Sequence, residues 1–461
     1  MQITDLSKRL KSTVGKGILK TAISNIGSTF TFRLAGSFIS VFLEIVLIRS
    51  LGYTEYSDFT FVWVFVRLSG ILFSLGFDRL VVRYVSEYSH NKNIGKLKGL
   101  LVFSYCVVTI AASVLLVGII TASKSTYIQS LLSLQGVFTT FYVAAPAIVL
   151  IAIQELQTGV LRGFGKVGHA VFWQSVAFPV AMSVVIVSLT FFYSSAVHIH
   201  NIALCGVLVL LLILVCQALV LVAKVKSIVN KFDSSSSALE FSFVEWLKVA
   251  FTMFVVRNGE QVMQKLQILI AGSMFGTAVV GFYNVAFRLV SLISYGLLIS
   301  NLATAHLFAR ADLQEQREKM QGLITLVAYI TFFSTAPIVA IFFIGIDPVL
   351  NYFGEEFLQG KSVLQVLLVA AAFNTITGPN LTLLMMMGAH KGLVLLNVAS
   401  ITMNLFLIFF LSPIFGYIGI AVAGSAAWIT TNTIVTIMVK KRTGYNSTVF
   451  RKLNLAILAR D

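Results

Sequence analysis

Charged residues are scarce in this chain. Only 11% of its 461 residues are Asp, Glu, Lys or Arg, whereas 57% are hydrophobic, and the mean hydropathy is +0.91. A soluble domain could not bury so much apolar surface, so a soluble protein is excluded. Acidic residues are the rarest charged group: 18 Asp and Glu stand against 34 Lys and Arg, which leaves a formal net charge of +16.

Residues that build chemical sites are also few. The three cysteines, Cys106, Cys205 and Cys216, each lie inside an apolar run, which predicts small core residues rather than a disulfide or a metal site. The six histidines are scattered, and there is no glycine-rich phosphate loop. We therefore expect no cofactor, no metal and no enzymatic activity. The basic first 25 residues lack the central apolar run of a cleavable signal peptide.

Long apolar runs fill most of the chain. A helix needs about 20 apolar residues to cross a bilayer, and the runs therefore predict an all-α polytopic membrane protein with about twelve transmembrane helices. The predicted spans are residues 26–50, 57–78, 99–122, 136–157, 170–193, 201–223, 247–272, 278–304, 320–344, 362–387, 392–412 and 416–439.

Basic residues fall in alternate gaps between these spans. The gaps at 79–98, 162–166 and 224–246 and the segment after 439 are rich in Lys and Arg, whereas the opposite gaps contain Arg49, Lys124 and Lys361. The positive-inside rule then places both termini in the cytoplasm. The predicted location of the protein is the cytoplasmic (inner) membrane. This placement accounts for the net charge without a nucleic-acid partner.

The chain divides into two halves that resemble each other. The stretch 224–246, with serines at 234–237, predicts a cytoplasmic linker between six-helix lobes at 1–223 and 247–440, followed by a tail at 441–461. A shift of 224 residues pairs Gly52 with Gly276, and a shift of 223 pairs Gly165 with Gly388. Six helices in each half would make the repeats parallel, around a central cavity.

Polar residues form stripes inside several predicted spans. In the first span the stripe covers an arc of about 80°, and in the second about 40°. Charges at this depth cost about 2.5–3.5 kcal/mol each unless they face protein or water, so such stripes predict a shared hydrated cavity. The first stripe contains Thr29, Arg33, Ser37, Ser40 and Glu44, and the second contains Thr60, Arg67, Ser74 and Asp78.

Cations dominate these stripes. Arginine stays charged, and one guanidinium group can bind two oxygens of a phosphate or carboxylate at once. The stripes therefore predict an anionic substrate group. A structural alternative is that the charges pair internally, as Arg257 and Glu260 could at i and i+3. The predicted substrate-binding residues are Arg33, Arg67, Arg257, Lys265 and Arg288; the predicted polar lining is Ser37, Ser40, Gln261, Gln264, Asn284 and Ser291; the candidates for ion coupling are Glu44, Glu155 and Glu260.

Three stretches, with the helix count and the cytoplasmic termini, resemble polysaccharide flippases (Wzx type) of the multidrug/oligosaccharidyl-lipid/polysaccharide exporter superfamily. They are LGYTEYSDFTFVWVFVRL (51–68), LRGFGKVGHAVFWQ (161–174) and FGTAVVGFYNVAFRL (275–289). The resemblance implies two six-helix lobes whose central cavity alternates between the membrane faces. It implies as substrate an undecaprenyl-diphosphate-linked oligosaccharide repeat unit for O-antigen, capsule or exopolysaccharide.

The resemblance also implies residue roles and partners. Arg33, Arg67 and Arg257 are similar in position to arginines of lipid II flippases, but Leu34 stands where those carry an acidic partner. Membrane lipid, a coupling proton or sodium ion, a polysaccharide polymerase and a chain-length regulator are the implied partners.

Three alternatives stay open. A multidrug or organic-cation antiporter of the same superfamily would need an acidic cavity. A membrane polysaccharide polymerase would need a substantial outer loop, whereas the largest outward gap, 345–361, is short. A scaffold protein would give no reason for arginines in the membrane.

Overall fold

The computed structural model describes the chain except for residues 1–2, 124–136, 194–196, 232–237, 258, 294–316, 381–382, 385–389 and 452–461. The described residues are almost entirely helical and contain no strand, as predicted. They include nine helices long and apolar enough to cross a membrane, and two shorter apolar helices, Val262–Phe275 and Ala278–Ile293. Each of the twelve predicted spans overlaps a described helix.

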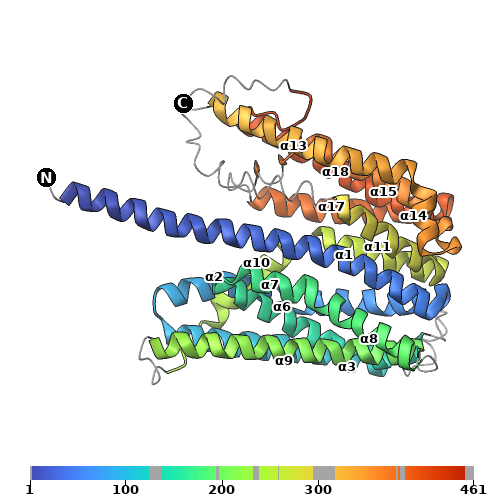
Figure 1. The fold of residues 1–461 in the computed structure, drawn as a ribbon, viewed down its shortest axis with the longest axis horizontal. Coiled ribbons are helices and arrows are strands. Elements are labelled where there is room, and N and C mark those ends of the chain that lie inside the picture. Colours follow the sequence, from blue (N-terminus) through green and yellow to red (C-terminus); the bar gives the residue numbers. More distant parts are fainter. Residues whose placement is uncertain are drawn as a thin grey trace.

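The first lobe begins with one long element, α1 (Ile3–Phe73), which contains the first predicted span and most of the second. Gly52 separates them with φ 75° and ψ 170°, a backbone conformation open essentially only to glycine. The chain turns back there, as Figure 1 shows. The rest of this lobe comprises α2 (Phe77–His90), α3 (Ile94–Ser123), α5 (Phe138–Ala144), α6 (Ala147–Gly163), α7 (Val167–Phe172), the π-helix η1 (Trp173–Ala177), α8 (Phe178–Phe192) and α9 (Ile199–Lys231).

The second lobe lies on the other side of α1 (Figure 1). Its contacts with the first lobe include those of α11 with α1 and those of α10 with α2. Its elements are α10 (Phe243–Arg257), α11 (Gly259–Phe275), the helix Ala278–Ile293 (called here the 278–293 helix), α13 (Arg317–Ile344), α14 (Ile346–Phe353), the 3-10 helix η3 (Glu355–Gly360), α15 (Lys361–Thr377), α17 (His390–Phe415) and α18 (Tyr417–Thr443).

The bundle has two distinct ends. We call the end with residues 79–98, 162–166 and 440–442 the basic end, and the end with Gly52, Gly276 and α14 the opposite end. Gly276 has φ 90°, so both glycines of the sequence repeat adopt positive φ. At the opposite end the lobes touch, because Tyr53 donates a hydrogen bond to the Ala278 carbonyl at 2.7 Å. The rings of Tyr53 and Phe357 also meet edge to face.

The predicted loop at 79–98 proves to hold an amphipathic helix, α2, and the predicted span 57–78 ends early, at Phe73. Leu75 and Gly76 have φ of 51° and 77°, which stops the helix before Asp78. The buried face of α2 packs on α6 and on α10. Tyr84 of α2 donates a 2.6 Å hydrogen bond to Glu245, and burial raises the pKa of Tyr84, so the hydroxyl stays a donor.

The ends of the predicted linker are ordered structure. Residues 224–231 continue α9, and the Glu240 N–H donates to the Gly95 carbonyl at 3.3 Å. Trp246 is fully buried against α2 and α3, where its indole N–H donates to Tyr88. The start of the second half of the sequence is therefore attached to the first lobe. The lobe boundaries at 223 and 247 stay predictions.

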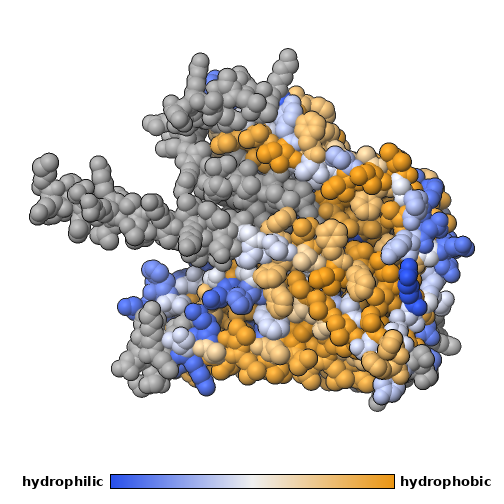
Figure 2. Space-filling view, viewed as in Figure 1, coloured by the Kyte–Doolittle hydropathy of each residue, from blue (hydrophilic) through white to orange (hydrophobic). Residues whose placement is uncertain are grey.

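Large apolar side chains cover much of the described surface on the face of the bundle that Figure 2 shows. Phe191, Ile344 and Phe409 are each more than 70% exposed. Such exposure is stable only where the surroundings are apolar, and the chain is a multi-pass membrane protein. Cys106 is exposed on this surface rather than buried in the core as predicted, because its helix α3 lies at the periphery of the first lobe (Figure 1).

Candidate functional site

A cavity of about 430 Å³ lies between the two lobes, and we call it the charged cavity. Its walls come from α1, α6, η1, α8, α11 and the 278–293 helix. The first limb of α1 contributes Arg33, Ser37, Ser40 and Glu44, which lie on one face because they are spaced three or four residues apart. Thr29, at the start of that predicted stripe, is buried and is not part of the wall.

The second limb of α1 contributes only the first half of its predicted stripe. Thr60 and Arg67 line the cavity, whereas Ser74 and Asp78 do not. Ser74 donates to the Ile71 carbonyl at 2.8 Å and to Asp78 at 3.3 Å. These two residues stabilise the break between α1 and α2 instead.

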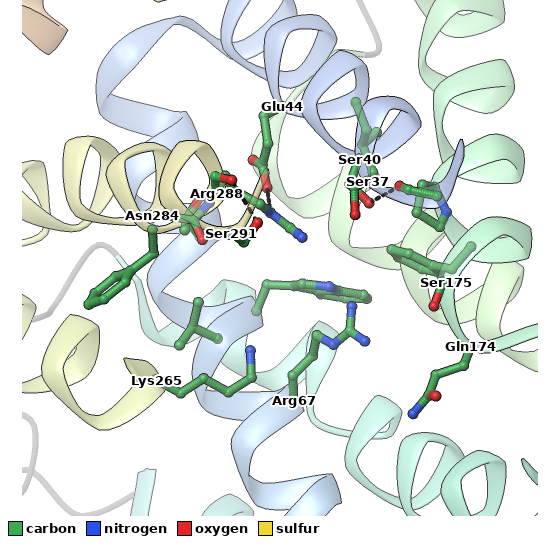
Figure 3. Close-up of a pocket in the computed structure, with 18 of the residues that line it drawn as sticks. Ser37, Ser40, Glu44, Arg67, Gln174, Ser175, Lys265, Asn284, Arg288 and Ser291 are labelled. Atoms are coloured by element: carbon green, nitrogen blue, oxygen red, sulfur yellow. Dashed lines mark hydrogen bonds and ion pairs between the residues drawn. The ribbon is translucent and has the colours of Figure 1, made fainter. Parts of the chain in front are cut away.

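The second lobe supplies a matching polar wall. Gln264 and Lys265 come from α11, and Asn284, Arg288 and Ser291 come from the 278–293 helix. In Figure 3, Arg67 and Lys265 extend into the cavity from one side, facing Glu44 and Arg288 on the other. The side chains of three further predicted site residues lie outside the described part of the structure, and their roles stay predictions: Arg257, Glu260 and Gln261.

A hydrogen-bonded bridge joins the lobes at one edge of this cavity (Figure 3). Arg288 Nε donates to Glu44 Oε1 at 3.1 Å, and the Tyr56 hydroxyl donates to Glu44 Oε2 at 2.8 Å. Asn284 Nδ2 in turn donates to the Tyr56 hydroxyl at 3.1 Å. Glu44 is only 6% exposed, and a carboxylate so buried is stable only with such partners. In this conformation Glu44, a candidate for ion coupling, holds the two lobes together.

Three polar residues of the cavity wall escaped the sequence argument. Arg162 Nη2 donates to Gln174 Oε1 at 2.5 Å, and Gln174 Nε2 donates to Glu155 Oε2 at 3.2 Å. Gln174 and Ser175 lie in η1, and a π-helix turn often marks a functional site because it changes the register of a helix. In the sequence, the one signal for Gln174 and Ser175 was that these two polar residues stand side by side within the apolar run 170–193. Arg162 was counted only as a basic loop residue.

The charged cavity carries an excess of positive charge. Among its described lining residues, five are cationic and two are acidic, a formal excess of three positive charges. A cleft of one sign between low-dielectric walls concentrates ligands of the opposite sign. The cations are Arg33, Arg67, Arg162, Lys265 and Arg288, and the acidic residues are Glu44 and Glu155.

Comparison with known proteins agrees with this geometry. The family model described as "Polysaccharide biosynthesis protein" matches residues 22–310, more than half of the chain. The chain belongs to this polysaccharide biosynthesis protein family. The matched region includes every charged residue of the cavity wall, from Arg33 to Arg288. No curated protein matches the chain.

Solved structures share the fold of this family member. An inward-facing multidrug resistance MATE transporter of the MOP superfamily is 15% identical, with 92% of this chain and 98% of that chain covered and a TM-score of 0.72. An outward-facing MATE transporter is 13% identical, with 91% and 95% covered and a TM-score of 0.60.

A MOP superfamily transporter from Pyrococcus furiosus, described as having a binding pocket of reverse polarity, is 14% identical, with 91% and 95% covered and a TM-score of 0.61. The two-lobed fold is therefore that of these transporters. The chain is thus a member of a polysaccharide biosynthesis protein family with the fold of these transporters.

Proposed function

We propose that this protein is a flippase that moves polyprenyl-diphosphate-linked oligosaccharide repeat units from the cytoplasmic to the outer leaflet of the cytoplasmic membrane. The undecaprenyl carrier is the proposed lipid, and a surface polysaccharide such as O-antigen, capsule or exopolysaccharide is the proposed product. Sugars and diphosphate cannot cross hydrocarbon unaided, so their movement needs a polar cavity with alternating access.

The excess of cations from both lobes around one cavity carries this proposal. Each phosphate of a diphosphate diester bears a negative charge. An arginine can bind such a phosphate through two parallel hydrogen bonds. Arg67, Lys265 and Arg288 surround the same space from α1, α11 and the 278–293 helix. Membership of a polysaccharide biosynthesis family supports a substrate that bears sugar.

The contacts between lobes support loading from the basic end. Tyr53 with Ala278 and Glu44 with Arg288 join the lobes toward the opposite end. The inward-facing transporter gives a higher TM-score than the outward-facing one, 0.72 against 0.60. If the basic end is cytoplasmic, as the positive-inside rule predicts, this conformation would receive a substrate made in the cytoplasm.

An organic-cation antiporter is disfavoured by the same charge. A cationic drug would meet five basic side chains and two acidic ones, one of which, Glu44, is already paired with Arg288. Glu155 stays the proposed site for a coupling proton or sodium ion, since it faces the cavity and accepts a hydrogen bond from neutral Gln174. A polymerase and a chain-length regulator are the proposed protein partners.

The test is complementation of cells that lack this protein. Wild type, Arg67→Ala or Arg442→Ala would be expressed, and surface polymer and lipid-linked repeat units would be measured in each leaflet. We expect loss of polymer with intact repeat units trapped on the cytoplasmic leaflet, rescued by wild type but not by Arg67→Ala. Arg442 is exposed in the last turn of α18, so Arg442→Ala removes equal charge outside the cavity and should rescue.

Two results would overturn the proposal. Repeat units that reach the outer leaflet but stay unpolymerised would indicate a polymerase. Normal polymer in the cells without the protein, with increased sensitivity to cationic drugs, would indicate an antiporter.

A further inference from the structure

A second cavity, of about 140 Å³, lies within the second lobe. We call it the lobe cavity. Its walls come from α11, the 278–293 helix, α15, α17 and α18. Gln264 and Phe287 line both this cavity and the charged cavity, so the two are neighbours with a shared wall.

The lining of the lobe cavity is polar but uncharged. None of its described lining residues is Asp, Glu, Lys, Arg or His. Side-chain amides both donate and accept hydrogen bonds, hydroxyl groups do the same, and an indole ring offers an apolar face. These groups suit a neutral ligand with many hydroxyls. The polar lining residues are Gln264, Gln267, Asn397, Ser400, Asn404, Ser425, Trp428, Thr431 and Asn432.

One buried polar atom in this lining has no partner within the described structure. Asn404 of α17 is only 1% exposed, and its Oδ1 accepts no hydrogen bond there. A buried acceptor left unpaired costs about 1–3 kcal/mol, so proteins rarely retain one without use for it. A ligand hydroxyl that donates to Asn404 Oδ1 would remove this cost.

A glycine makes room for a second amide. A Cβ built on Gly424 of α18 would lie 2.3 Å from Gln267 Nε2 and 2.6 Å from its Oε1. Gln267 is 4% exposed, and its amide therefore occupies space that any other residue at 424 would take. The wall of α18 is thus shaped around a polar group of α11.

We propose that the lobe cavity binds a neutral sugar ring of the lipid-linked oligosaccharide while the charged cavity binds its diphosphate. This inference rests on the proposed flippase function. A buried water needs at least about 10–15 Å³ of such space, so 140 Å³ holds roughly ten water-sized groups, comparable to one hexose ring. A sugar directly follows the diphosphate, so a ligand that occupies both neighbouring cavities would pass Gln264 and Phe287, which line both.

The test compares two ligands on the purified protein in lipid nanodiscs. One is undecaprenyl diphosphate, and the other is the lipid-linked repeat unit isolated from cells that lack this protein. We expect wild type to bind the repeat unit about tenfold more tightly. Asn404→Leu and Trp428→Leu should each reduce this advantage to about twofold and leave the affinity for undecaprenyl diphosphate unchanged.

Matched controls separate folding from binding. Asn201→Leu makes the same substitution on an exposed residue of α9 in the first lobe and should keep the full advantage. Thermal unfolding of each variant checks its fold. If Asn404→Leu unfolds, Trp428→Leu carries the test by itself, since that side chain is only partly buried.

The outcomes distinguish this inference from the function on which it rests. Variants that keep the tenfold advantage would overturn the sugar site while leaving the flippase intact. Binding of sodium ion to the lobe cavity, lost in Asn404→Leu without any change in sugar preference, would overturn it too. If neither ligand binds wild type, the flippase proposal itself fails.

Discussion

The two cavities differ in charge and in the way they are built. The charged cavity lies between the lobes and has seven charged residues among its described lining, whereas the lobe cavity lies within one lobe and has none. A site between rigid bodies changes shape when the bodies move, but a site inside one body keeps its shape. The charged cavity is therefore suited to gating, and the lobe cavity to selecting a ligand.

The two cavities also differ in whether their buried polar groups have hydrogen-bond partners. At one edge of the charged cavity Glu44, Tyr56, Asn284 and Arg288 satisfy one another, and two of these hydrogen bonds cross between the lobes. In the lobe cavity Asn404 Oδ1 has no partner in the described structure. Opening the lobes would break the hydrogen bonds that Asn284 and Arg288 make to the first lobe and leave the second site unchanged. The following predictions test this contrast.

Locking the lobes together should have the largest effect. A Cβ built on Gly281 would lie 3.5 Å from the Ser57 Cβ, within the usual range of about 3.5–4.5 Å for a disulfide. In a chain carrying Cys106→Ala, Cys205→Ala and Cys216→Ala, the pair Ser57→Cys and Gly281→Cys should crosslink under oxidant. Flipping in proteoliposomes should then stop completely.

Reduction distinguishes a lock from damage. Flipping should return with a reductant, and either cysteine variant by itself should be insensitive to oxidant. Sugar preference in nanodiscs should survive the crosslink, because the lobe cavity lies within one lobe. Full flipping by the crosslinked protein would contradict the assignment of the lobe contacts to a gate.

Removal of one cavity arginine should have the next largest effect. Arg67→Ala should weaken binding of undecaprenyl diphosphate by about 1.5–3 kcal/mol, or roughly 10- to 150-fold, because it removes charged hydrogen bonds. Arg67→Lys should weaken binding less, because lysine keeps the positive charge but cannot bind two phosphate oxygens in parallel as arginine does. Affinity would be measured in nanodiscs, and unchanged affinity in Arg67→Ala would place the diphosphate elsewhere.

Neutralising the bridge should have a moderate effect. Glu44→Gln keeps the shape of the side chain but removes its ion pair with Arg288. The loss of about 1 kcal/mol of attraction between the lobes should slow crosslinking of the 57/281 cysteine pair roughly fivefold. The matched control is Glu55→Gln, because Glu55 accepts its hydrogen bond from Ile199 within the first lobe. Equal slowing in both variants would show a general loss of packing.

Narrowing the lobe cavity should have the smallest effect. Gly424→Ala adds one methyl group where the Gln267 amide lies, and the flexible amide can move aside. The preference for the repeat unit over undecaprenyl diphosphate should fall about twofold, with the affinity for the bare lipid unchanged. Gly118→Ala, on α3 with open space around the added Cβ, is the control. A larger loss for the bare lipid would show that the cavities are coupled.

Much of the fold follows from local pattern. Every apolar run predicted as a span overlaps a described helix. The repeat paired Gly52 with Gly276, and both adopt positive φ. One exception lies between Phe73 and Phe77, where hydropathy continues but Leu75 and Gly76 turn left-handed. Another is Gly378, whose φ of 66° ends α15 inside the predicted span 362–387. A short break between two helices leaves little trace in a hydropathy average, so α2 escaped the sequence argument.

The site was partly predictable for the same reason. Arg33, Ser37, Ser40 and Glu44 line the cavity together because helical spacing places them on one face. Gln174 and Ser175 could not be foreseen, since a π-helix shifts the register of their segment. Arg162, in the last turn of α6, was counted only as a basic loop residue. Asn404 and Gly424 carried no signal, because an isolated amide or glycine in an apolar span also serves helix packing.

The sequence by itself determined the helical membrane architecture and the excess of cations. The bilayer thickness sets the length of each apolar run, and helical periodicity places nearby residues on one face, so both can be seen in local sequence. Only the tertiary structure decided that Glu44 pairs with Arg288, 244 residues away. It also decided that α17 and α18 enclose a neutral cavity beside the charged one. Such pairings depend on how rigid helices pack across a lobe boundary, and local sequence does not encode that geometry.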